Sequence, residues 1–110
     1  MKSTLLIVDD DEEIRSQMKW ALADEYDLLV AGDRGGALEL ARQARPPVAL
    51  LDLGLPPHPT ETDEGFATLA ELLAHDRQMK IIVVTGQGEK DNALRAVGEG
   101  AYDFLSKPVD

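Results

Sequence analysis

The chain has 110 residues, of which 44% are hydrophobic and 29% are charged, and it contains no cysteine. This length is enough for one domain with a real core, the composition excludes a disordered segment, and the lack of thiols excludes a disulfide framework or a thiolate metal site. A net charge of −10 would repel a phosphate backbone, so we expect no nucleic acid to bind this chain.

The first apolar stretch, Leu5–Val8, has only four residues and is followed by five consecutive acids. It is too short for a signal peptide or a membrane span. We therefore predict a cytoplasmic protein without a membrane partner.

Along the chain, short apolar runs alternate with segments of helical periodicity. The runs predict strands at Leu5–Val8, Leu28–Ala31, Val48–Leu51, Ile81–Val84 and, with a more alternating edge-strand pattern, Tyr102–Ser106. The periodic segments predict helices at Asp11–Ala23, Gly35–Ala44, Gly65–His75 and Glu89–Gly98. Strands that alternate with helices predict an α/β fold with a parallel sheet and right-handed crossovers.

No linker or repeat divides the chain, so we predict one domain over residues 1–110. A doubly wound sheet needs helices on both faces, and four helices leave one face thinly covered. We therefore expect a fifth helix that is missing from this segment. On the first helix, we expect Trp20 to be packed or partly exposed.

Polar residues follow the predicted strands at the edge where an open parallel sheet binds its ligands. Asp9 and Asp10 follow the first strand, Asp52 the third, Thr85 the fourth and Lys107 the fifth. Three carboxylates repel one another unless a cation lies between them, and Mg²⁺ prefers such oxygen ligands. A carboxylate can also accept a phosphoryl group, a transfer that needs mainly positioning and charge neutralisation.

Four motifs resemble those of receiver domains from bacterial two-component response regulators. They are Leu-Ile-Val-Asp-Asp ending at Asp10, Leu-Leu-Asp-Leu around Asp52, Val-Val-Thr-Gly around Thr85, and Phe-Leu-Ser-Lys-Pro from Phe104 to Pro108. The resemblance runs from about residue 4 to the last residue. It implies a flavodoxin-like, doubly wound, five-stranded parallel sheet in the order 2-1-3-4-5.

The resemblance implies a role for each matching acid. Asp52 would be the phosphoacceptor. Asp10 and Asp52 would bind Mg²⁺ directly, Asp9 would bind it through water, and the backbone carbonyl of Gly54 would be a further ligand.

Other roles implied by the resemblance concern the response to phosphorylation. Lys107 would contact the phosphoryl oxygens, Thr85 would move toward the phosphoryl group, and Phe104 would turn inward as an aromatic switch. A cis Lys107–Pro108 peptide bond is also implied, as cis bonds are essentially a proline feature.

The function implied is that of a signal receiver phosphorylated by a sensor histidine kinase. It would switch a C-terminal output domain of a transcriptional kind that is absent from this segment, and it could form a homodimer through the fourth helix and fifth strand. It would catalyse only its own phosphorylation and dephosphorylation, and so act as a regulator instead of a turnover enzyme.

The loop after Asp52 departs from the family pattern. In many receivers a glycine follows the acceptor by about eight positions, whereas the matching Gly65 is thirteen residues after Asp52. The proline-rich connection from Gly54 to Glu64 is therefore roughly five residues longer, and long ordered loops are often functional.

Two alternatives remain from the residues. One is a Mg²⁺-dependent aspartyl phosphatase that uses Asp9 as nucleophile and Asp11 as acid, and the other is a degenerate receiver that is not phosphorylated and only binds proteins. The acids after the first strand also have a simpler interpretation as helix-start residues. We expect His58 and His75 to be surface residues.

Overall fold

The computed structural model describes residues 2–57, 61–86 and 89–106. Strands and helices alternate in the order β1 Ser3–Val8, α1 Glu12–Leu22, β2 Tyr26–Ala31, α2 Arg34–Ala44, β3 Val48–Asp52, α3 Asp63–His75, β4 Lys80–Thr85, α4 Lys90–Gly98 and β5 Asp103–Ser106. The strands pair in parallel in the order β2-β1-β3-β4-β5. The predicted fold class and strand order are confirmed.

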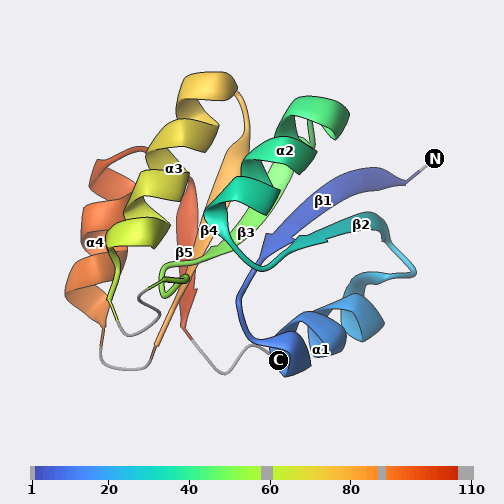
Figure 1. Cartoon of the computed structure of the whole chain (residues 1–110), viewed down its shortest axis with the longest axis horizontal. Coiled ribbons are helices and arrows are strands. Elements are labelled where there is room, and N and C mark those ends of the chain that lie inside the picture. Colours follow the sequence, from blue (N-terminus) through green and yellow to red (C-terminus); the bar gives the residue numbers. More distant parts are fainter. Residues whose placement is uncertain (1, 58–60, 87–88, 107–110) are drawn as a thin grey trace.

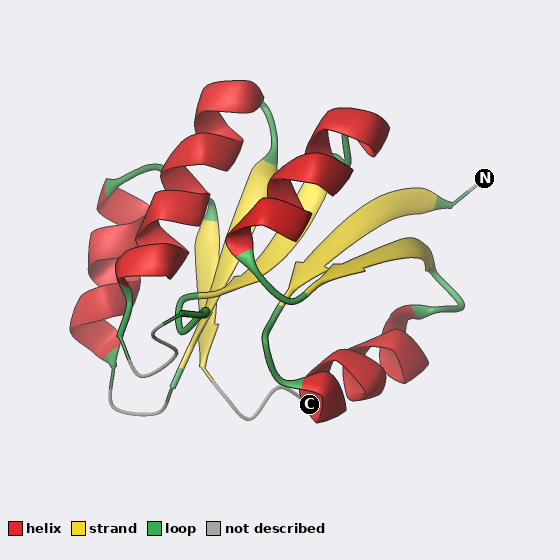
Figure 2. Cartoon of the chain, in the orientation of Figure 1, coloured by secondary structure: helices red, strands yellow, loops and turns green. Residues whose placement is uncertain are grey.

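The helices lie on both faces of the sheet, with α2, α3 and α4 on one face and α1 on the other (Figures 1 and 2). Successive side chains of a strand point to opposite faces, so each central strand contributes to two cores. In β1, Leu6 and Val8 pack in the larger core, whereas Leu5 and Ile7 pack with Met18 of α1 in the smaller one. Continuous apolar runs are therefore needed in the central strands.

Two aspartates begin the first two helices. The Asp11 carboxylate accepts a hydrogen bond of 2.9 Å from the Glu13 amide at the start of α1, and the Asp33 carboxylate accepts one of 2.7 Å from the Gly36 amide at the start of α2. Each satisfies a backbone donor that has no partner within its helix. Of the acids after β1, Asp11 is therefore the one that acts as a helix cap.

The position of Trp20 was predicted wrongly, because its side chain is 88% exposed. It lies two residues after Met18, which is buried against the sheet. Two residues correspond to about 200° around an α-helix, so Trp20 points away from the sheet.

The strand β5 forms one edge of the sheet, as its alternating pattern predicts. Phe104 packs against the larger core, while Leu105 is 41% exposed and Tyr102, just before the strand, is 63% exposed. Among the described elements α1 is the one helix on the face of the smaller core, and the expected fifth helix is not among them. In the described part of the chain, no helix is long and apolar enough to cross a membrane.

Candidate metal centre at the carboxyl edge of the sheet

The strand register places Asp9, after β1, beside Asp52, at the end of β3. β1 lies between β2 and β3, which is the point where the strand order reverses. Val8 is paired with Leu51 in the parallel register. Asp9 and Asp52, the next residue of each segment, therefore reach the carboxyl edge together.

Three carboxylates meet at this edge. Asp9, Asp10 and Asp52 each offer an oxygen, and these oxygens lie within 4.8 Å of one another. Asp9 is 1% exposed and Asp52 7% exposed, and Asp10 is more accessible. Buried carboxylates that lie together need compensating positive charge, and an all-oxygen donor set with partial access for water suits a hard divalent ion such as Mg²⁺.

Asp9 is held through its backbone as well as its side chain. Its amide donates to the Ala31 carbonyl at 3.0 Å, and its carboxylate accepts from the Asp11 amide at 2.9 Å. Its carbonyl accepts a bond of 3.1 Å from Nη1 of Arg15 in α1. The sequence did not single out Arg15, because nothing in its helical position distinguishes it from a surface arginine.

Asp52 lies at the end of β3, followed by a tight turn. Its carboxylate accepts a bond of 3.2 Å from the Gly54 amide. The first turn of α3 contacts this segment at Gly65, where a Cβ atom would overlap the backbone of Leu53 and lie 2.6 Å from its carbonyl carbon. The close approach supports the match of Gly65 with the family glycine and explains why this position lacks a side chain.

The connection between Asp52 and α3 starts with a buried anchor. Leu55 is completely buried in the larger core, and a cis peptide bond joins Pro56 to Pro57. The sequence did not identify Leu55 as a core residue, because it lies outside any periodic pattern.

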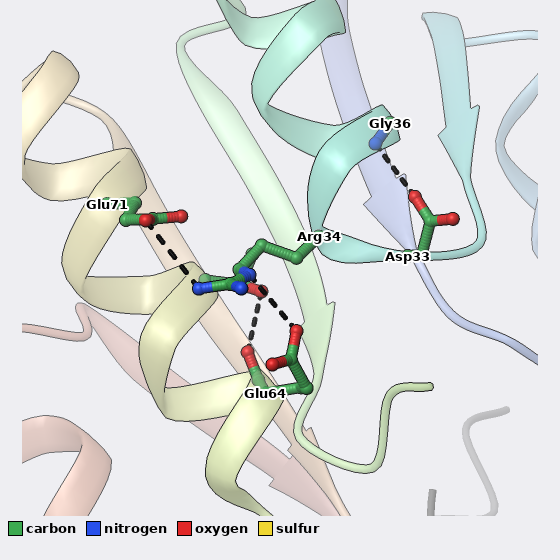
Figure 3. A network of polar contacts seen from close by, with 6 residues as sticks. Asp33, Arg34, Gly36, Glu64 and Glu71 are labelled. Atoms are coloured by element: carbon green, nitrogen blue, oxygen red, sulfur yellow. Dashed lines mark hydrogen bonds and ion pairs between the residues drawn. The ribbon is translucent and has the colours of Figure 1, made fainter. Parts of the chain in front are cut away.

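At its far end the connection joins a helix that is tied to α2 (Figure 3). Arg34, the first residue of α2, forms ion pairs of 3.0 Å with Glu64 and 3.6 Å with Glu71 of α3. The Thr68 hydroxyl donates to the Glu64 carbonyl at 2.7 Å. The long loop is thus anchored at both ends by contacts made with other elements.

Thr85 and Phe104 lie on neighbouring strands and on the same face. Thr85 is 2% exposed at the end of β4. Phe104 is opposite Val83 in the register, and both pack in the larger core. Thr85, two residues after Val83, is therefore the diagonal neighbour of Phe104 on that face.

Two of the predicted features lie outside the described residues: Lys107 with its peptide bond to Pro108, and His58. His75 is exposed, as expected. Asp11, the acid of the phosphatase alternative, accepts hydrogen bonds from the amides of Glu13 and Ile14. Its use as a helix cap gives that alternative no support.

Comparison with known proteins gives one consistent result. The family model described as "response regulator receiver domain" matches residues 5–110. The regulatory protein AtoC of Escherichia coli (strain K12) is 32% identical over 107 residues, which are 96% of this chain and 22% of AtoC. The transcriptional regulatory protein SrrA of Staphylococcus aureus is 36% identical over 109 residues, 98% of this chain and 43% of SrrA.

Among solved structures, NtrX from Brucella abortus superposes with a TM-score of 0.91 and 29% identity over 100% of this chain and 24% of NtrX. The chain thus spans less than half the length of these relatives. Because the family match covers nearly all of the chain and the strand order agrees with it, the chain belongs to the response regulator receiver domain family.

Proposed function

We propose that Asp52 accepts a phosphoryl group from the phosphohistidine of a sensor histidine kinase, in a reaction that depends on Mg²⁺. The observation that carries this proposal is the meeting of the Asp9, Asp10 and Asp52 carboxylates within 4.8 Å at the carboxyl edge of a receiver fold.

The residues at the carboxyl edge of the sheet have different roles in this reaction. Asp10 and Asp52 would hold Mg²⁺ directly, Asp9 through water, and the Gly54 carbonyl would be a further ligand. When bound, the ion supplies neutralisation of the charge on the transferring phosphoryl group. The hydrogen bond from the Gly54 amide orients the Asp52 carboxylate, and an oxygen of that carboxylate forms a bond to phosphorus as the phosphorus–nitrogen bond of the phosphohistidine breaks.

Phosphorylation would change the surface formed by α4 and β5. The phosphoryl group on Asp52 carries about two negative charges and three acceptor oxygens. Lys107 and the Thr85 hydroxyl would contact these oxygens. Movement of Thr85 opens space for its diagonal neighbour Phe104 to turn inward. Such a change shifts the population between two arrangements of the surface.

This surface is also the proposed contact for partners. It carries exposed apolar side chains from α4 and from the residue just before β5: Leu94, Val97 and Tyr102. Leu105 is also exposed, but it follows Phe104 in β5 and therefore points to the opposite face of the sheet. We propose a homodimer through α4 and β5 and a C-terminal output domain that regulates transcription. The relatives named as transcriptional regulatory proteins support the latter. Residues 1–110 would form one receiver domain that catalyses only its own phosphorylation and dephosphorylation.

The test is to incubate the chain with Mg²⁺ and an acyl phosphate and to locate the aspartyl phosphate by mass spectrometry. We expect the label on Asp52 and its loss in Asp52→Asn, with an unchanged circular dichroism spectrum because the amide has nearly the same shape. Asp27→Asn, which makes the same change at an exposed position of β2, should be labelled like the original chain.

The same experiment separates the alternatives. Label on Asp9 would favour the phosphatase and contradict the receiver mechanism. No label, together with no spectral change or stabilisation on addition of beryllofluoride and Mg²⁺, would favour the degenerate receiver.

A further inference from the structure

We propose that Arg15 is a positioning residue of the metal site. Its guanidinium, seated against Gly32, fixes the carbonyl of Asp9 and thereby sets the direction in which Asp10 presents its carboxylate. This inference rests on the proposed Mg²⁺ site and names a residue that acts on it without touching the ion.

The contact is to the peptide group that joins the two acids. Nη1 of Arg15 donates to the Asp9 carbonyl at 3.1 Å in a partly buried setting. A peptide group is planar, so fixing the carbonyl oxygen of Asp9 also fixes the Asp10 amide and the bond to its Cα. On the other side of Asp9, its amide, which belongs to the preceding peptide group, donates to the Ala31 carbonyl at 3.0 Å. The two peptide groups that flank Asp9 are therefore each restrained, one from β2 and the other from α1.

Space for the guanidinium comes from Gly32. A Cβ atom at this position would overlap Nη1 of Arg15 and would lie 3.9 Å from the Asp9 carbonyl oxygen. The backbone of Gly32 is not in the left-handed region, so it does not itself require glycine. A side chain at position 32 would therefore displace the Arg15 guanidinium from its place beside the Asp9 carbonyl.

Loss of the contact should loosen Asp10 and weaken the site. Residues that orient metal ligands typically change metal affinity by about ten- to a hundredfold when they are removed. Arg15→Ala should therefore weaken Mg²⁺ binding about tenfold. An electrostatic role predicts the opposite sign, since removal of a positive charge near three carboxylates strengthens cation binding.

The experiment measures Mg²⁺ affinity by isothermal titration calorimetry, and thermal unfolding in EDTA, for the original chain, Arg15→Ala and Lys19→Ala. Lys19 lies on the same side of α1 one turn further along, is exposed, and carries the same charge. We expect weaker binding in Arg15→Ala, and affinity in Lys19→Ala within twofold of the original chain.

A second variant reaches the same contact from the other side. Gly32→Ala places a methyl group where the guanidinium lies, and the flexible Arg15 side chain must move away. We expect Gly32→Ala alone to weaken Mg²⁺ binding as Arg15→Ala does, and to add no further loss in the double variant, because the methyl group then has free space. This coupling does not arise if the two changes merely lower stability.

Each remaining outcome overturns the inference. Unchanged or tighter binding in Arg15→Ala, an equal loss in Lys19→Ala, or additive losses in the double variant would each show that the contact does not position Asp10. If the original chain itself binds no Mg²⁺ in the titration, the proposed metal site fails first and the role of Arg15 falls with it.

Discussion

The geometry around Asp52 depends on neighbours that have no reactive group. Gly65 lets the first turn of α3 contact the backbone of Leu53, the residue directly after the proposed acceptor. The turn after Asp52 is therefore fixed by close backbone packing as well as by the hydrogen bond from the Gly54 amide.

Gly65→Ala should destabilise the fold, because its Cβ would overlap backbone atoms that cannot rotate away. We expect a loss of about 1–3 kcal/mol in the free energy of unfolding, the usual cost of overpacking, as measured by urea denaturation. Gly98→Ala is the matched control in a helix. A Cβ there meets nothing within 4 Å, so we expect a gain of up to about 1 kcal/mol from helix propensity.

The residues of the proposed metal site could be predicted from sequence because their places depend on chain position alone. Asp9 and Asp52 follow directly after apolar runs, Asp10 follows Asp9, and the strand ends of a parallel sheet share one edge. Arg15 and Leu55 were missed, because the reach of a helical arginine and the burial of a loop leucine are set by tertiary packing and leave no local pattern.

At the scale of the elements, the ion pairs of Arg34 tie the start of α2 to α3 (Figure 3). They are partly shielded, since the side chains of Arg34 and Glu64 are 39% and 22% exposed. They hold the helix that receives the long loop from Asp52, and so stabilise the loop from outside.

Arg34→Ala should lower the free energy of unfolding by about 0.5–1 kcal/mol, and most of the difference should disappear in 1 M NaCl because exposed ion pairs are screened by salt. Arg42→Ala is the matched control. Its pair with Glu39 is 4.0 Å long and both side chains are more than 60% exposed, so we expect a change smaller than about 0.5 kcal/mol. Equal effects of both variants would mean that the Arg34 pairs do not tie the helices together.

Element types and order could be predicted from periodicity, and boundaries only to within one or two residues. The helix α3 starts at Asp63, two residues before the predicted Gly65, because the first turn of a helix carries polar residues that break the apolar pattern. The orientation of Trp20 was missed for a related reason, since an aromatic residue on a polar helix face gives no sign of being exposed.

At the scale of the whole molecule, folding itself brings three acids together in a chain of net charge −10. The unfolded chain does not contain this site, so an ion that binds it favours the folded state.

The strand order could be predicted only from the family resemblance, because periodicity identifies strands without saying which strands are neighbours.

Mg²⁺ should therefore raise the stability of the chain. At a concentration ten times its dissociation constant, we expect about 1.4 kcal/mol of added stability, measured as a rise in melting temperature relative to NaCl of the same ionic strength. Asp10→Asn should reduce this rise, because it removes a proposed direct ligand. A rise of equal size with NaCl would attribute the effect to screening of the net charge.

The anchoring of the long loop has a consequence for how such chains can diverge. Leu55 holds the loop to the core just after Asp52, and Gly65 holds its other end against Leu53. Between two fixed points, added length costs little, about 0.6 kcal/mol for each doubling of a flexible loop. The connection between Leu55 and Gly65 is therefore a place where insertions can accumulate, or where an engineer can graft a recognition peptide, without displacing the acceptor.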